Sequence, residues 1–366
     1  MIQTFSSTIR RREMDAVLTC MVDEKIGPGE LNARLIQNIK ENFQCAGSVA
    51  LRSPSIALHY ALKAMNVSKD DAVMISALAP AWQIHALEDF GYTALVLDVQ
   101  EETGLVNSDI VSEGMKNGGR VLLLHETMGI LPDMDNLLAL NIPIIEDISQ
   151  SVGAVYRPDS VSSVGEDLDV SAQVPASDSA ENLKKAGSFG VFTIMGMEEN
   201  DIVTAGGGAV LMAPKRRDWT VLKEYADAIP RTDLLPDINS ALGFVQLKEF
   251  RRNEEVRKEI FAMYQRSLMA GKNKTFIRSS DDGSAAWGFP VVLSGNCMDA
   301  RKYAERKEIE VKSAFEDSVI ALRPEDFGMT CKKAKSLFMR CVLFPMYPRL
   351  SKNQILKISK VLGTLP

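Results

Sequence analysis

The chain has 366 residues, 46% of them hydrophobic and 25% charged, which excludes disorder of the whole and leaves material for one large core and a smaller second one. A formal net charge of -6, with no basic run longer than residues 10–12, argues against nucleic acid as the main partner. The N-terminal residues lack the apolar segment of a signal peptide, and no stretch approaches ~18 uninterrupted apolar residues. We therefore expect a cytoplasmic protein with no membrane partner.

Helical and strand patterns alternate through the first two thirds of the chain. The apolar spacing predicts helices over residues 31–43, 55–65, 81–90, 106–115 and 133–138. Between them, short branched runs predict strands over residues 48–51, 72–77, 93–97, 121–124 and 142–145. Such βαβ alternation is typical of an α/β fold whose mostly parallel sheet is covered by helices on both faces.

The residue composition changes after Tyr156. Residues 157–188 contain no aromatic side chain and are rich in Ser, Asp and Glu, which predicts a long surface excursion. Strands are expected at 190–195, 209–212 and 287–293, a long helix from Ile238 towards Leu268, and helices at 298–307, 331–339 and 352–362. We predict a large domain over residues 1–245, and a connecting helix with a small α+β domain over residues 246–366.

Cysteine and histidine offer little chemistry. The five cysteines are odd in number and form no CxxC pair, which favours reduced thiols over a disulfide framework. The three histidines show no i, i+4 spacing, so we expect no metal site.

The strand predicted at Ile142–Ile145 is the most informative element, because two carboxylates follow it directly. A buried parallel strand delivers its carboxyl end to the crevice where open α/β sheets bind ligands. Asp147 is therefore expected to face a cation, since an unpaired buried charge is too costly to keep.

Segments spread along the whole chain carry a resemblance to a known family. They are GPGELNARLIQNIKENF, SPSIALHYALKAM, DDAVMISALAPAW, HETMGILPDMDNL, IPIIEDISQSVGAVY, DINSALGFVQLKEF and VLFPMYPRLSKNQILKISKVL. In this order and spacing they resemble the DegT family of nucleotide-sugar aminotransferases. The resemblance implies the aspartate-aminotransferase fold (fold type I) with a large α/β/α domain and a smaller C-terminal α+β domain. It also implies the cofactor pyridoxal 5'-phosphate (PLP), a homodimer and a nucleotide-sugar-type ligand.

The resemblance assigns roles in a cofactor pocket. Asp147 matches the carboxylate that pairs with the ring nitrogen, and Gln150 matches the residue beside the ring hydroxyl. A cap on the following turn is the alternative for Asp147. Pro80 falls where relatives place an aromatic ring over the cofactor. His125 matches a family histidine, which on its own is more often structural than an acid or base.

Phosphate recognition is only half retained. Ser53 and Ser55 flank Pro54 where relatives carry Ser-Gly-Thr, and proline supplies no N–H. Ser53 as a helix N-cap with Pro54 at the first helical position is the alternative. Thr193 matches a serine that touches the phosphate in relatives, or else packs as a β-branched strand residue.

The largest departure concerns the lysine that forms the Schiff base in relatives. Glu198 stands at that position, and residues 189–214 contain no lysine. A carboxylate cannot form a Schiff base and adds negative charge near a phosphate. Lys184, Lys185 and Lys215 flank the segment and read most simply as solvated surface residues.

Three hypotheses follow from this substitution. The chain is an aminotransferase of a keto-sugar nucleotide that uses a displaced lysine, or a relative that binds PLP or a sugar nucleotide noncovalently with Glu198 as a proton-transfer group, or a non-catalytic dimeric binding or regulatory protein. The second and third hypotheses are favoured over the first. PLP, if it binds, is then held without a covalent bond.

Overall fold

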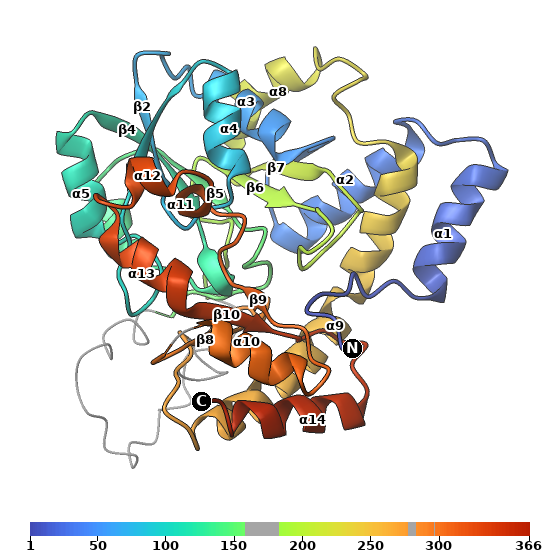
Figure 1. Ribbon diagram of the computed structural model, residues 1–366. Helices are drawn as coiled ribbons and strands as arrows, with labels where there is room; N and C mark the ends of the chain where they lie inside the picture. Colours follow the sequence, from blue (N-terminus) through green and yellow to red (C-terminus); the bar gives the residue numbers. More distant parts are fainter. Residues whose placement is uncertain (158–182, 277–282, 296) are drawn as a thin grey trace.

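A computed structural model of the protein describes residues 1–157, 183–276, 283–295 and 297–366 (Figure 1). Most of the predicted surface excursion therefore lies outside the described residues. Within the described part of the chain, no helix combines the length and the apolar character needed to cross a membrane.

A seven-stranded sheet forms the centre of the larger part of the molecule, with its strands in the order β1-β7-β6-β5-β4-β2-β3. All neighbouring strands run parallel except β7, which is antiparallel to both β1 and β6. The mostly parallel sheet predicted from the sequence is thus confirmed. The strands are β1 (Gly47–Leu51), β2 (Ala72–Ser76), β3 (Thr93–Leu97), β4 (Gly119–His125), β5 (Ile144–Asp147), β6 (Phe192–Gly196) and β7 (Ala209–Ala213).

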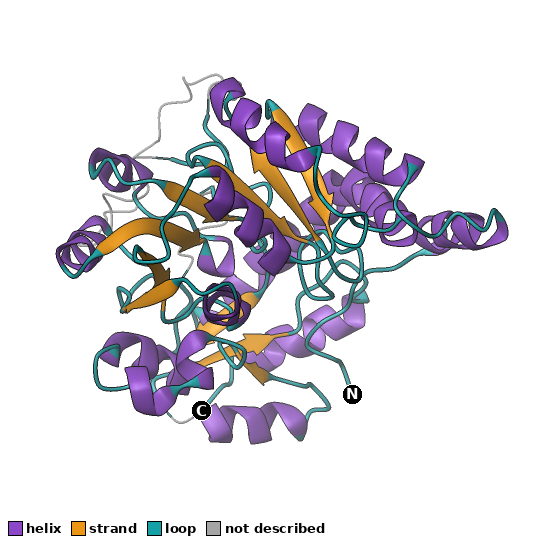
Figure 2. Ribbon diagram, turned by 90° about the horizontal axis from the view of Figure 1, so that it is seen from above, coloured by secondary structure: helices purple, strands orange, loops and turns teal. Residues whose placement is uncertain are grey.

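Helices cover both faces of this sheet (Figure 2). One face packs against α3 (Pro54–Ala64), α4 (Trp82–Asp89) and α8 (Arg216–Ala226). The other face packs against α2 (Glu30–Phe43) and α9 (Asp237–Leu268) over one half, and α5 (Ser108–Lys116) and α6 (Met134–Ala139) over the other. Burial on both sides explains why the strands read as continuous apolar runs. A further helix, α1 (Arg11–Val22), packs on α9 at the outer edge (Figure 1).

The C-terminal region is built on a second, three-stranded antiparallel sheet in the order β8-β10-β9. Its core combines β8 and β10 with α10, α14 and the end of α9, and it also takes in Ile2, which pairs with Ile309. The elements are β8 (Phe289–Val292), α10 (Cys297–Glu305), β9 (Lys312–Ser313), α11 (Val319–Leu322), α12 (Pro324–Phe327), α13 (Lys332–Arg340), β10 (Cys341–Phe344) and α14 (Lys352–Leu362).

Helix α9 joins the two parts of the molecule. It has 32 residues, and its N-terminal half contributes Leu247 to the core on α2, while its C-terminal half contributes Phe261 and Tyr264 to the core of the small sheet. The predicted domain boundary at residue 245 falls inside this helix. The N-terminal half lies close to the loop between β6 and β7 because Gly243 has no side chain: a Cβ there would sit 3.3 Å from the Cβ of Ala205.

Candidate active site

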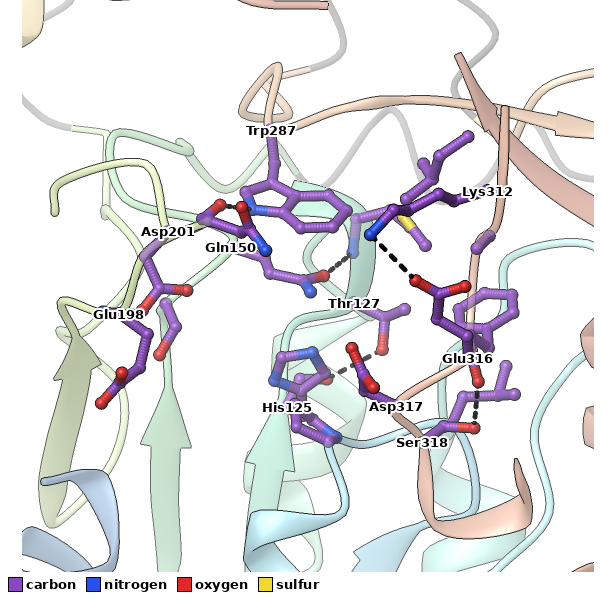
Figure 3. Close-up of a pocket in the computed structure, with 18 of the residues that line it drawn as sticks. His125, Thr127, Gln150, Glu198, Asp201, Trp287, Lys312, Glu316, Asp317 and Ser318 are labelled. Atoms are coloured by element: carbon purple, nitrogen blue, oxygen red, sulfur yellow. Dashed lines mark hydrogen bonds and ion pairs between the residues drawn. The ribbon is translucent and has the colours of Figure 1, made fainter. Parts of the chain in front are cut away.

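A cavity of about 240 Å³ opens at the carboxyl ends of β4, β5 and β6 (Figure 3). His125 comes from the end of β4, Gln150 from the segment after β5, and Glu198 and Asp201 from the loop after β6. Residues 312–318 of the C-terminal region close the opposite side. The cavity thus lies at the sheet edge that the sequence predicted for ligand binding.

Asp147 lies behind this cavity and is completely buried. Its Oδ2 accepts from His125 Nδ1 at 2.9 Å and from Gln83 Nε2 at 2.8 Å. Its Oδ1 accepts from the backbone N–H of Ser149 at 3.2 Å and from the Ser149 hydroxyl at 2.5 Å. All four acceptor positions of the carboxylate are therefore taken by the protein itself, and Asp147 does not contribute to the cavity wall.

Strand register explains the contact between His125 and Asp147. The two residues end the parallel strands β4 and β5 and stand directly beside each other in the ladder. Burial alone would raise the pKa of Asp147, but His125 and then the hydrogen bonds from Ser149 outweigh it and hold the pKa below its usual value. The sequence predicted that Asp147 faces a cation; in the structure its hydrogen-bond partners are His125, Gln83 and Ser149, and its pairing with a cofactor stays a prediction.

Three other residues predicted for the pocket lie in the cavity wall. Gln150 accepts the backbone N–H of Met128 at 2.8 Å through its side-chain oxygen. Pro80 forms an isolated bridge with Ser318, so the turn after β2 is tied to the C-terminal region. His125 lines the cavity, while its Nδ1 contacts Asp147. Their predicted roles towards a cofactor remain predictions.

The residues predicted for phosphate recognition are placed differently. The Ser53 hydroxyl accepts the N–H of Ile56 at 3.2 Å, and Pro54 is the first residue of α3, which confirms the helix-cap interpretation. Neither Ser53 nor Ser55 belongs to the cavity wall, whereas Pro54 does. Thr193 is completely buried in β6 and donates its hydroxyl to the carbonyl of Gly187 at 2.9 Å, which leaves it to pack as a strand residue.

Glu198 lies in the cavity wall, in the loop that follows β6. Its carboxylate accepts the N–H of Gly208 at 3.3 Å, and its own N–H is accepted by Asp201 at 2.7 Å. Lys184, Lys185 and Lys215 are exposed and do not line the cavity, which agrees with their interpretation as surface residues.

Sequence reasoning missed a cation in the opposite wall. Lys312, in β9, lines the cavity and lies 3.4 Å from Glu316 and 5.8 Å from the ring centre of Phe5. Asp317 is its neighbour in the same wall (Figure 3). No local motif marks Lys312, because only the folding of the C-terminal region against the large sheet brings it to this place.

Two further buried carboxyl groups, those of Glu126 and Glu146, lie near Asp147. Glu146 accepts the backbone N–H groups of Gly187 and Phe189 at 2.8 Å and that of Gly190 at 2.5 Å. Glu126 accepts the hydroxyl of Ser151 with one oxygen, while its other oxygen meets no donor among the residues that the structure describes. Burial, then the charge of Glu146, raises the pKa of Glu126 well above its usual value, so Glu126 carries the proton of the pair.

The resemblance implies PLP, which needs a lysine for its aldehyde, a carboxylate for its ring nitrogen and donors for its phosphate. Glu198 in the cavity wall carries no amine, and the carboxylate of Asp147 already receives four hydrogen bonds from the protein. For the phosphate, Pro54 offers no N–H. The residues present therefore do not fit a PLP molecule that is anchored through the loop after β6.

Comparisons with known proteins agree on the ancestry of the chain. It is 20% identical to the GDP-perosamine synthase of Escherichia coli O157:H7, over 98% of this chain and 96% of that protein. A putative sugar aminotransferase from Streptococcus pneumoniae, solved in its PLP-form, superimposes with a TM-score of 0.81 at 18% identity, covering 99% of this chain and 97% of that one. An E. coli GDP-4-keto-6-deoxy-D-mannose-3-dehydratase with bound hydrated PLP gives 0.80 at 15% identity, covering 99% of both chains.

The family assignment comes from the model of the DegT/DnrJ/EryC1/StrS aminotransferase family, which matches residues 7–220 and 228–362. The structural neighbours are PLP-dependent enzymes, and the mostly parallel sheet is that of fold type I. The predicted resemblance and fold class are thus confirmed, and the chain belongs to the DegT/DnrJ/EryC1/StrS aminotransferase family.

Proposed function

We propose that this protein is a cytoplasmic member of the sugar aminotransferase family that has lost lysine-dependent transamination and uses its cavity for binding or altered chemistry on a sugar-type ligand. The observation that carries the proposal is that Glu198 lies in the cavity wall. The resemblance described above aligns this residue with the family lysine. A carboxylate cannot condense with an aldehyde. The sugar class is suggested by the relatives, among them a GDP-perosamine synthase.

Borohydride trapping tests this proposal. The purified protein is incubated with PLP, reduced with borohydride, digested and mapped by peptide mass spectrometry. We expect no pyridoxyl adduct on a lysine of the cavity, because no amine is available in the loop after β6. Glu198→Lys is the matched variant, and it should gain an adduct at residue 198 if that residue stands in the place of the family lysine.

A displaced lysine is the second candidate, and Lys312 is the residue that favours it. Among the described residues that line the cavity it is the one lysine, and its side chain is 39% exposed, so that it is open to a ligand. An adduct on Lys312 that disappears in Lys312→Arg would refute lost transamination and favour an active enzyme. Lys215→Arg, at an exposed lysine outside the cavity, is the control.

We propose in addition that two copies of the chain form a homodimer through α1. One side of this helix packs on α9. Four of its apolar residues are nevertheless exposed: Met14 (51%), Leu18 (54%), Met21 (55%) and Val22 (80%). An exposed apolar stripe of this kind is typical of a protein interface.

Light scattering after size-exclusion chromatography checks this interface. We expect the wild-type protein at about twice the mass of the chain and Leu18→Glu at the mass of one chain, because a charge in an apolar interface is costly. Val221→Glu, at a residue of α8 that is 43% exposed, is the matched control and should leave the mass unchanged. A dimer that persists in Leu18→Glu would place the interface elsewhere.

A further inference from the structure

We propose that His125 and Asp201 act as general base and general acid in a cofactor-independent proton transfer on a small, uncharged hydroxy-carbonyl ligand, with Asp147 positioning His125. This inference rests on the proposed function for the use of the same cavity, and it names a chemistry for it that requires neither PLP nor a lysine.

The base is defined by the hydrogen bond between His125 and Asp147. A buried carboxylate 2.9 Å from Nδ1 fixes the imidazole as the tautomer that carries its proton on that nitrogen. Nε2 is then an acceptor, and among the described residues no hydrogen bond is made to it. Because His125 lines the cavity while Asp147 does not, we take Nε2 as the nitrogen that meets a ligand. The carboxylate of Asp147 accepts the proton on Nδ1 and holds the ring in this orientation.

Asp147 is suited to orienting the ring of His125 and has no direct role towards a ligand. Its carboxylate receives four hydrogen bonds and is sealed from the cavity, so it touches no ligand. Its lowered pKa keeps it ionised, which stabilises the imidazolium that forms when His125 takes a proton. The pair therefore has the base-and-orienter arrangement that general-base catalysis uses.

Asp201 supplies the acid from the adjacent part of the wall. Burial raises the pKa of its carboxyl group to about 8; the N–H of Glu198 opposes this rise, and the charges of Asp147 and Glu198 add to it. At neutral pH Asp201 therefore carries a proton that it can donate. A base and a neutral acid in one cavity form the arrangement expected of an acid–base pair.

Gly196 shows how close these groups lie. A Cβ on Gly196 would stand 2.6 Å from the Ser149 hydroxyl and 2.7 Å from Oδ2 of Asp201. The Ser149 hydroxyl in turn donates to Asp147, which contacts His125. The acid and the base therefore lie at the two ends of one compact polar cluster, and any side chain at residue 196 would collide with it.

The proposed step balances without a further reactant. Nε2 of His125 removes a proton from the carbon next to the ligand carbonyl. The electrons of that C–H bond form a C=C bond, and the carbonyl oxygen takes the proton of Asp201, which gives an enediol. Return of a proton to carbon restores a carbonyl, and nothing is oxidised or reduced overall.

The other residues of the wall select the ligand class. Glu198, Glu316 and Asp317 face the cavity with Lys312 as the opposing ammonium group, so an anionic ligand is disfavoured. Trp287 and Phe5, whose rings lie 5.7 Å apart, offer an apolar side to the C–H groups of a polyol. The cavity volume of about 240 Å³ suits a small molecule.

Deuterium exchange tests the proposal with dihydroxyacetone as the probe. The full-length protein is incubated with the probe in D2O without PLP, and loss of the C–H signal is followed by proton NMR. We expect exchange above the buffer rate, and a decrease of the protein-dependent rate by about 100-fold or more in His125→Gln. His85→Gln, at an exposed histidine of α4, is the matched control and should retain the rate.

The pH profile separates catalysis from a structural role. Asp147 is the charged group that faces His125, and Glu198 and Asp147 are those that act on Asp201. The wild-type rate should fall as pH rises through about 8, where Asp201 loses its proton, and this alkaline decrease should vanish in Asp201→Asn, which is slower throughout.

Two results would overturn the proposal: no exchange above the buffer rate with folded wild-type protein, or exchange that is undiminished in His125→Gln. If circular dichroism shows that His125→Gln is unfolded, Asp201→Asn decides through its pH profile. The borohydride experiment reports on lysine chemistry alone, so an adduct on a cavity lysine would refute the proposed function without altering the exchange result.

Discussion

Replacing Asp147 with alanine should lower the free energy of unfolding by about 3–5 kcal/mol, the range found when one partner of a buried polar pair is removed. The carboxylate receives four hydrogen bonds, and its loss leaves the side-chain donors of Gln83, His125 and Ser149 without an acceptor. Each buried donor left in this way costs about 1–3 kcal/mol. Urea unfolding followed by circular dichroism measures the difference.

Asp147→Asn is the informative companion variant. Asparagine keeps the shape and one acceptor oxygen, so it should be less destabilising than alanine. Asp135→Ala, in the first turn of α6, removes a carboxyl group that accepts from Tyr156 and lies outside this cluster. A loss below about 1 kcal/mol in Asp147→Ala would mean that the donors find other partners, and the rigid cluster described above would not exist.

Replacing Glu126 with glutamine should stabilise the protein at alkaline pH. In the folded chain Glu126 keeps its proton because burial raises its pKa, whereas in the unfolded chain it ionises near its ordinary value. Between these two pKa values the folded state binds more protons, so wild-type stability falls as pH rises, by about 1.4 kcal/mol per pH unit from this group. Glutamine is neutral at every pH and removes this dependence.

The measurement is a series of urea unfolding curves between about pH 5 and about pH 8. The advantage of Glu126→Gln should be small at the acidic end and should grow with pH. Glu113→Gln, at a residue of α5 whose side chain is 64% exposed, controls for the loss of a carboxyl group in general. Parallel stability profiles for wild type and Glu126→Gln would show that Glu126 is ionised in the folded protein.

The central sheet could be predicted from the sequence because its strands are short, branched and buried on both faces. The strand predicted at Ile142–Ile145 is observed at Ile144–Asp147. Pro143 has no N–H for the ladder, and the two carboxylates continue the strand because they pair with β4 and β6. Helix α1 was missed because several of its apolar side chains face away from the molecule, so that its pattern is not that of a core helix.

The site was predictable in its location and only partly in its contacts. The carboxyl end of β5 indicated where a ligand would bind, and a cation facing Asp147 was expected there. That Gln83 and Ser149 would share the carboxylate could not be read from spacing, because it depends on strand order and on how α4 packs. Lys312 and Asp317 are brought in by the C-terminal region, whose packing against the sheet leaves no local signature in the sequence.

The long helix α9 limits where residues can be inserted into or deleted from this chain. At about 1.5 Å and 100° per residue, one residue inserted near its middle would turn the small sheet by more than a quarter of a revolution relative to the large one. Residues 312–318 would then leave the cavity, and one wall of the site would be lost. We therefore expect α9 to accept neither insertion nor deletion between its two packed ends, because its length fixes the orientation of one sheet relative to the other.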